Sequence, residues 1–324
     1  MTKSQKCDII IIPRGQGQQA PMVERRYLPM NTKPLDRRRK YYIVLDCETA
    51  THPYASQFDG NDRKKIAIAK PLIYDFAWNV VDCKGNIYRR KSFLITEIFS
   101  VPSIFNTAYY AIKRPLYIEK LQKGEIKLVG WNEAVNELLS DLQEVSSLGA
   151  YNSMFDFKKA IYYTENYINH LYSADFFEWD EKQKKHIDFI VSQKTYKNEK
   201  DFDSKNLTLR NQTFPIFDIW GLACSHLLDN DDFRAFCLEN KLVTASKKFY
   251  STTAETAYKF LKKDIEFSEA HTAIEDSNIE TEILSEIFKK VKPKDMEMGI
   301  IYFPFRLVGT VPTEYIEENF SEIF

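Results

Sequence analysis

The chain is poor in cysteine, in long apolar runs and in net charge, and each shortage excludes a class of protein. The five cysteines are scattered and never follow the CxxC spacing: Cys7, Cys47, Cys83, Cys224 and Cys237. Such a set fits neither a disulfide framework nor a cysteine-ligated zinc site, and it favours a reducing compartment. The longest aliphatic run, Ile9–Ile12, is far too short to span a membrane, and no apolar segment typical of a signal peptide precedes it. We therefore expect a cytoplasmic protein with no membrane contact.

Charge is balanced over the whole chain but not along it. The net charge of −1 gives no overall attraction to nucleic acid, so any such attraction must be local. Residues 1–40 hold ten basic and three acidic residues, and prolines and the run "GQGQQ" interrupt regular structure there. We interpret this segment as a basic, partly disordered N-terminal arm. It is either simply solvated, or it attracts phosphates or docks a partner.

From Tyr41 onward the hydrophobic pattern predicts an α/β domain. Short apolar runs of strand length come first and then alternate with segments of helical period. Strands are expected at 41–47, at 148–151, at 214–219 and twice within 71–95, around a turn at 84–86; helices are expected at 131–145, 154–168 and 272–290. This order indicates a central mixed sheet covered by helices.

The expected α/β domain spans residues 41–292 and carries two additions. Residues 174–206 hold eight acids, seven lysines and six aromatic residues without a clean period. A compact domain seldom needs so long a connection, which predicts an insertion at about 165–212. The insertion is either a peripheral elaboration or a lid that grips a substrate. Residues 293–324 form a C-terminal extension, apolar enough to pack on the domain or to bind a partner.

The first of three acidic motifs ends the first expected strand. Asp46 and Glu48 stand one residue apart in "VLDCETA". Alternate side chains of a strand share a face, so the two carboxylates point the same way. Two like charges placed together are costly unless a positive charge lies between them.

The second motif, "YNSMFDF", follows a short expected strand. Asn152 or Ser153 can cap the helix that begins there. Asp156 then lies in the first helical turn, where the helix dipole favours an anion.

The third motif, "HTAIED", opens the closing helix. Thr272 and Glu275 have the spacing of a capping box, which starts the helix at Thr272. His271 then precedes the helix and Asp276 lies inside it, so the two side chains can converge on one site. Glu280 lies one turn after Asp276 on the same helical side.

Together these motifs resemble those of the DEDDh 3′–5′ exonucleases, the family of the bacterial polymerase III epsilon proofreading subunit. The matching residues are Asp46 and Glu48 in "LDCET", Asp156 in "NSMFD", and His271 with Asp276 in "HTAIED". The resemblance covers roughly residues 41–290 and implies an RNase H-like exonuclease fold with a central mixed five-stranded sheet. The glycine that usually follows the threonine of the first motif is absent, since Ala50 follows Thr49.

The resemblance also implies a site for two metal ions, Mg²⁺ or Mn²⁺, with Asp46, Glu48, Asp156 and Asp276 as ligands. Such hard cations prefer carboxylate oxygens, and no Cys/His cluster supports zinc. The family chemistry is in-line attack of a metal-activated water on the terminal phosphodiester, with His271 taking the proton of that water.

Three further residues are expected at the substrate. By the same resemblance, Thr49 lines the pocket for the last nucleotide and Asn152 orders the loop of the second motif. Phe155 and its neighbour Met154 can stack on a base, although core packing is the alternative for at least one of them.

We therefore expect a metal-dependent 3′–5′ exonuclease that releases nucleoside 5′-monophosphates from the 3′ end of single-stranded nucleic acid, DNA rather than RNA. A polymerase or another replication or repair protein is an expected partner. Two alternatives stay open: an RNA-directed 3′–5′ exoribonuclease, and a non-catalytic nucleic-acid-binding or scaffolding protein with the same fold.

Overall fold

The computed structural model describes residues 35–51, 70–173 and 203–320. Residues Asn31–Phe324 form one compact unit. Most of the expected basic arm (1–34) and of the expected insertion (174–202) lies outside the described residues.

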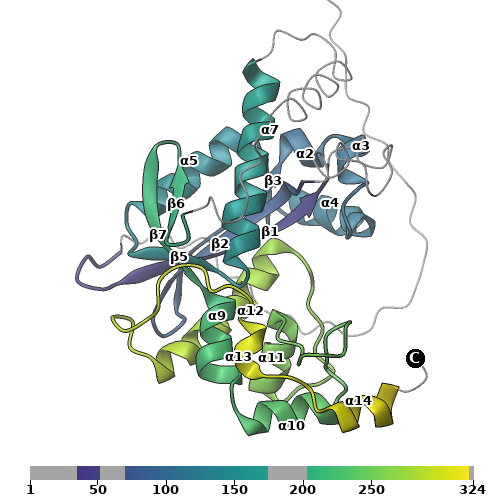
Figure 1. Ribbon diagram of the computed structural model, residues 1–324. Helices are drawn as coiled ribbons and strands as arrows, with labels where there is room; N and C mark the ends of the chain where they lie inside the picture. The colour runs from purple at the N-terminus through teal and green to yellow at the C-terminus, as the bar shows by residue number, and fades with distance from the viewer. Residues whose placement is uncertain (1–34, 52–69, 174–202, 321–324) are drawn as a thin grey trace, which may run out of the picture. The chain divides into compact units, whose positions relative to one another are not determined.

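A mixed sheet forms the centre of this unit (Figure 1). Within the described residues it has seven strands in the order β4-β3-β2-β1-β5-β7-β6. The strands are β1 (Tyr41–Ala50), β2 (Leu72–Asp82), β3 (Ile87–Ile95), β4 (Lys127–Val129), β5 (Ser147–Ala150), β6 (Asn206–Leu209) and β7 (Gln212–Asp218). β1 is antiparallel to β2 and parallel to β5, and β5 is parallel to β7. The carboxyl ends of β1, β5 and β7 therefore meet at one edge of the sheet.

Helices cover both faces of this sheet (Figure 1). Before β6 they are α2 (Thr96–Phe99), α3 (Pro102–Phe105), η2 (Ala111–Lys113), α4 (Arg114–Gln122), α5 (Trp131–Leu142), α6 (Ser153–Phe155), the π-helical turn η3 (Asp156–Ala160) and α7 (Ile161–Ser173). After β7 they are α9 (Ile219–Ala223), the π-helical turn η5 (Cys224–Leu228), α10 (Asp231–Glu239), α11 (Ala254–Lys262), α12 (Ala273–Lys290), α13 (Phe305–Val308) and α14 (Thr313–Phe320).

Successive side chains of β1 point to opposite faces of the sheet, and an apolar core lies on each face. Ile43 and Leu45 face the core that α2–α5 and α7 cover. Tyr42 and Val44 face the other core, where α12 packs with α9–α11. Asp46 and Glu48 continue the Tyr42–Val44 face, so they point towards the side of the sheet that α12 covers.

The prediction of an α/β fold with a mixed, helix-flanked sheet is confirmed, but the number of strands in the expected sheet is wrong. The described sheet has seven strands rather than five. The additional strands, β4 and β6, lie at the two edges and contain three and four residues. β4 has too few residues to show the period-2 pattern by which a sequence reveals a strand, and β6 lies in the segment 165–212 that the sequence marks as an insertion.

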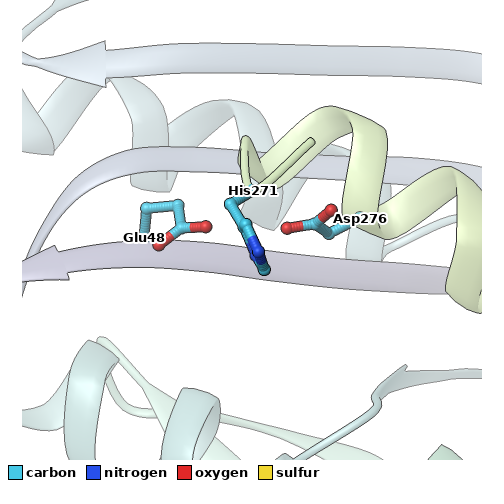
Figure 2. A group of neighbouring side chains, drawn as sticks. All are labelled: Glu48, His271 and Asp276. Atoms are coloured by element: carbon cyan, nitrogen blue, oxygen red, sulfur yellow. The ribbon is translucent and has the colours of Figure 1, made fainter. Parts of the chain in front are cut away.

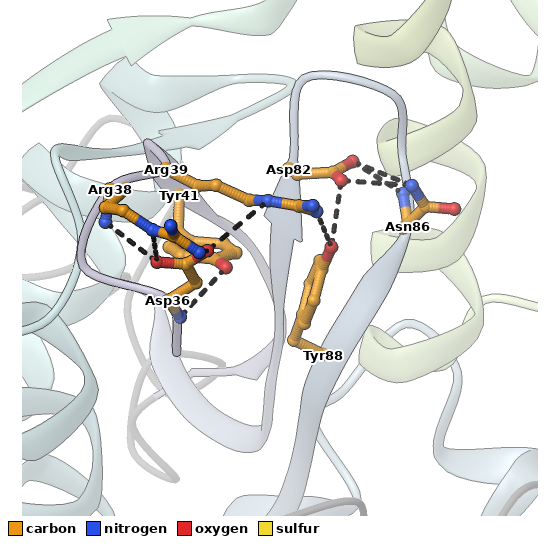
Figure 3. Close-up of polar contacts among 7 residues, drawn as sticks. All are labelled: Asp36, Arg38, Arg39, Tyr41, Asp82, Asn86 and Tyr88. Carbon is orange, nitrogen blue, oxygen red and sulfur yellow. Dashed lines mark hydrogen bonds and ion pairs between the residues drawn. The ribbon is translucent and has the colours of Figure 1, made fainter. Parts of the chain in front are cut away.

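Two hydrogen-bonded loops lie next to each other at the start of β1 (Figure 3). Asp36 accepts hydrogen bonds from Arg38, while Arg39 donates to the Tyr88 hydroxyl at 3.3 Å. Asp82 closes the β2–β3 turn by accepting from the backbone N–H of Asn86 at 3.1 Å and from its side chain. The residues just before β1 are thereby tied to the sheet.

The segment after α12 packs along the domain. Its backbone bonds to β7 through Gly299 N–H and Ile216 O at 2.7 Å, and Val308 is fully buried. Within the described ranges, every helix is too short or too polar to serve as a membrane span.

β5 packs closely against β7, which sets the spacing of the strand ends. A substitution at Gly149 of β5 tests this packing. A Cβ at this position would lie 2.2 Å from the Phe217 ring on β7. We expect Gly149→Ala to lower the free energy of unfolding by roughly 1–3 kcal/mol, because buried backbone and rings must move apart. Urea unfolding measures the change. Gly130→Ala, whose Cβ would meet only Glu97 Oε1 at 3.4 Å, is the control and should cost at most about 1 kcal/mol. Equal losses in the two variants would contradict the tight packing of β5.

Candidate metal centre

Two elements bring the first and third acidic motifs together. β1 supplies Asp46 and Glu48, and α12 crosses β1 and β2 on the same side of the sheet. Ser277 Oγ of α12 donates a hydrogen bond to Val44 O of β1 at 2.9 Å, and Asn79 Nδ2 of β2 donates to Ser277 Oγ at 3.0 Å. These buried bonds fix the first two turns of α12 against the acidic end of β1.

The N-terminus of α12 begins where the sequence predicts, but its cap is different. Thr272 is the N-cap residue, yet its hydroxyl donates to Glu275 Oε2 at 2.6 Å instead of accepting a backbone N–H. The acceptor for Ala273 N is Asp75 Oδ2 of β2, at 3.0 Å, which also accepts from Tyr117. The predicted capping box is therefore wrong in its bonding, because a buried carboxylate from the sheet takes that place.

Glu48, His271 and Asp276 converge (Figure 2). One possible ligand atom from each lies within 4.8 Å of one atom of each of the other two. Figure 2 shows the imidazole between the two carboxylates, with Glu48 coming from β1 and Asp276 from the first turn of α12. Two carboxylate oxygens and one imidazole nitrogen at this spacing could hold a metal ion.

Asp46 and Asp156 lie close to this trio without being part of it. Asp156 is buried at the start of η3, and its Oδ1 accepts a hydrogen bond from Cys47 Sγ at 3.0 Å. Burial raises the pKa of Asp46 well above its ordinary value, and the negative charges of Glu280 and Asp156 raise it further. Asp276 and Glu48 act on it in the same direction. The four acids predicted as ligands thus share one electrostatic neighbourhood.

A fifth acid, Glu280, belongs to the same neighbourhood and was not predicted as a site residue. Its side chain is buried, and Glu280 Oε2 has no hydrogen-bond partner among the described residues. The same holds for Asp276 Oδ1, one helical turn earlier. The spacing of the two acids in the sequence shows that they share a helical side. It does not show that this side is buried against β1.

Burial and mutual repulsion dominate the ionisation of these acids. Burial raises the pKa of Glu48 to about 9, with the charge of Asp276 as the next cause. The pKa of Asp276 rises to about 8, through burial and then the charge of Glu269. Burial raises the pKa of Asp156 to about 7, although the Cys47 hydrogen bond opposes this. Without a nearby cation, the centre therefore retains protons at neutral pH.

His271 lies in the loop before α12, next to a second pair of acids, Glu255 and Glu269. Its Nδ1 lies 3.7 Å from Glu269 Oε2, and its ring stacks on the Tyr110 ring at 4.3 Å between centroids. Glu255, Glu269 and His271 also have possible ligand atoms within 4.8 Å of one another. Burial lowers the pKa of His271, and the positive charge of Lys113 lowers it further. The imidazole is therefore neutral near pH 7.

The three expected substrate residues lie at the end of β1 and after β5. Thr49 follows an irregularity in the β1–β2 pairing and is partly exposed. Asn152 Oδ1 accepts a hydrogen bond from Phe155 N at 3.3 Å, which caps α6 and orders the loop that leads to Asp156. Phe155 and Met154 are both partly buried against the core. Their packing agrees with the core alternative that the sequence left open.

Neutralising one acid of this centre should stabilise the metal-free protein. Asp276→Asn removes a negative charge, and Asp276 Oδ1 makes no hydrogen bond to any described residue. We therefore expect the free energy of unfolding to rise by about 1 kcal/mol at pH 8. The control is Asp82→Asn. Burial acts to raise the pKa of Asp82, but hydrogen bonds from Asn86 and Lys84 bring it below the ordinary value, so this change should destabilise by about 1 kcal/mol. Chemical denaturation distinguishes the two, and a loss of stability in both variants would make Asp276 a structural residue.

The stability of the metal-free protein should fall as the pH rises. Asp156 and Asp276 have folded pKa values of about 7 and 8, against roughly 4 for an unfolded aspartate. Between about pH 4 and pH 8 the folded chain therefore binds more protons than the unfolded chain. The two carboxyl groups contribute fully to stability below about pH 4, and this contribution is lost by about pH 8. Mn²⁺ should raise Tm more at pH 8 than at pH 6, because it binds the deprotonated carboxylates. Thermal unfolding with and without Mn²⁺ tests this, and a metal effect independent of pH would speak against carboxylate ligands.

The chain was compared with protein-family models, with curated proteins and with solved structures, and none of these comparisons found a match. The function proposed below therefore depends on the residues and geometry of the centre itself.

Proposed function

We propose that this chain is a metal-dependent 3′–5′ exonuclease that hydrolyses terminal phosphodiesters of single-stranded nucleic acid, DNA in preference to RNA. One observation carries the proposal. Acids from the end of β1, from the turn after β5 and from the start of α12 come together beside a histidine. These are the motifs through which the sequence resembles the DEDDh exonucleases.

The residues present fit a pair of divalent cations. Asp276 Oδ1 and Glu280 Oε2 are buried without hydrogen-bond partners in the described part of the chain, and such atoms are costly unless something positive binds them. Asp46, Glu48, Asp156 and Asp276 would hold Mg²⁺ or Mn²⁺, and Glu280 adds a further negative charge beside them. When bound, such ions supply an activated water and stabilise the charge on the leaving 3′-oxygen.

His271 is the residue that would take a proton in this reaction. Its ring lies between Glu48 and Asp276, at the acids rather than at the periphery (Figure 2). Because Nδ1 faces Glu269, Nε2 is the atom that would accept the proton. A neutral imidazole near pH 7 is able to do so.

Other parts of the chain agree with this function. The strands β3-β2-β1-β5-β7 are central in the seven-stranded sheet, and we propose that this sheet is an RNase H-like exonuclease fold with β4 and β6 as additions. We also assign contact with the 3′-terminal nucleotide to Thr49, near the end of β1, and to Asn152, the N-cap of α6. We further propose a cytoplasmic location and a polymerase or repair protein as partner.

Loss of the histidine should affect turnover far more than metal binding. We expect His271→Ala to reduce the rate of mononucleotide release from a 3′-labelled single strand by about 10²–10⁴-fold. Glu48→Gln should reduce it at least as much and should also weaken Mn²⁺ binding measured by calorimetry. The exposed His226 supplies the control, since His226→Ala should stay within about twofold of the unmodified protein. A near-normal rate for His271→Ala would remove this residue from the proton-transfer role.

Matched DNA and RNA single strands in the same assay decide between the candidate substrates. Faster release from DNA supports the proposal, and faster release from RNA replaces it with an exoribonuclease. If neither strand is degraded with Mg²⁺ or Mn²⁺ while the chain still binds them, the protein is a non-catalytic nucleic-acid-binding or scaffolding protein.

A further inference from the structure

We propose that Tyr110 and Lys113 are positioning residues that hold the His271 imidazole over Glu48 and Asp276. The role in catalysis rests on the proposed nuclease function, whereas the role in holding the loop does not. Neither residue belongs to an acidic motif, and both come from the segment between α3 and α4, more than 150 positions before the histidine.

The first contact is between two rings. Tyr110 and His271 stack with centroids 4.3 Å apart and planes 14° from parallel. This arrangement covers one face of the imidazole, and the ring lies between Glu48 and Asp276 (Figure 2). A stacked ring resists rotation of the imidazole about its side-chain bonds, because each rotation would break the contact.

The second contact fixes the backbone of the same loop. Lys113 Nζ donates a hydrogen bond to Ala270 O and lies 3.4 Å from His271 O. The same ammonium group lies 4.6 Å from the centroid of the Tyr110 ring. One side chain therefore binds both the loop and the ring that covers the histidine.

The loop needs such support because its conformation is unfavourable. His271 has a φ of +46°, in the left-handed region that residues with a Cβ seldom adopt. Conformations of this kind persist where neighbouring structure determines them, and they concentrate at functional sites. Without the contacts from Tyr110 and Lys113, the loop would be free to relax towards a negative φ and carry the imidazole away from the acids.

The supporting segment is itself attached to the first motif. Thr107 Oγ1 accepts a hydrogen bond from Thr51 N at 2.7 Å. Thr51 directly follows β1. The segment from Thr107 to Lys113 thus connects the strand that carries Glu48 to the loop that carries His271, and it sets the distance between them.

Substitutions in the segment from Tyr110 to Lys113 test the proposal. Tyr110→Ala removes the stacked ring, Tyr110→Phe keeps it without the hydroxyl, and Ile112→Ala is the control, since Ile112 lies in the same segment and is 87% exposed. Lys113→Met removes the backbone contact, and Lys113→Arg retains a donor. Two readouts are needed: kcat and KM on a 3′-labelled single strand with Mn²⁺, and deuterium exchange of the amides from Glu269 to Thr272 in the metal-free protein.

We expect Tyr110→Ala and Lys113→Met to lower kcat by up to about 10²-fold, with KM within about threefold, and to speed exchange of the loop amides. Tyr110→Phe, Lys113→Arg and Ile112→Ala should stay close to the unmodified protein in both readouts. Unchanged exchange in Tyr110→Ala and Lys113→Met would overturn the proposal, as would a rise in KM with kcat preserved. If the unmodified chain has no nuclease activity, the proposed function fails, and the exchange measurement still decides whether these residues hold the loop.

Discussion

Repulsion between buried carboxylates is the constraint on which the whole centre depends. Five acids lie within one electrostatic neighbourhood: Asp46, Glu48, Asp156, Asp276 and Glu280. Burial disfavours the charged form of each acid, and each charge disfavours the others. Such a group keeps its protons or gathers cations. A nearby positive group, Lys113, opposes the rise in the pKa of Glu48 and Asp276 but does not cancel it.

The fold holds these acids together with apolar packing and with hydrogen bonds that lie just outside the centre. β1 lies between β2 and β5, so its acidic end cannot withdraw without disturbing the sheet. α12 is fixed by Asp75 at its first N–H and by Ser277 on the Val44 carbonyl. The stability lost at the centre is thus offset by the two cores on either side of the sheet.

The sequence predicts those features of the site that depend on local periodicity. Asp46 and Glu48 share a face because a strand repeats every two residues. The spacing of Thr272 and Glu275 predicts the start of α12 correctly, although Asp75 supplies the cap. Contacts between distant segments could not be predicted. Asp75 caps a helix 198 positions away, and the stacking of Tyr110 on His271 depends on a loop whose path no local pattern reveals. The sequence predicts neither edge strand, because β4 has only three residues and β6 lies in the segment interpreted as an insertion.

The most direct test of the central claim is to locate a metal among the acids. Crystals grown or soaked with Mn²⁺ and measured at its absorption edge give the ion's position independently of any activity. The account predicts anomalous density between Glu48 and Asp276, within coordination distance of their oxygens, and a second peak towards Asp46 and Asp156. Well-ordered crystals with no anomalous density at the acids, or with density only on the outer surface, would contradict it.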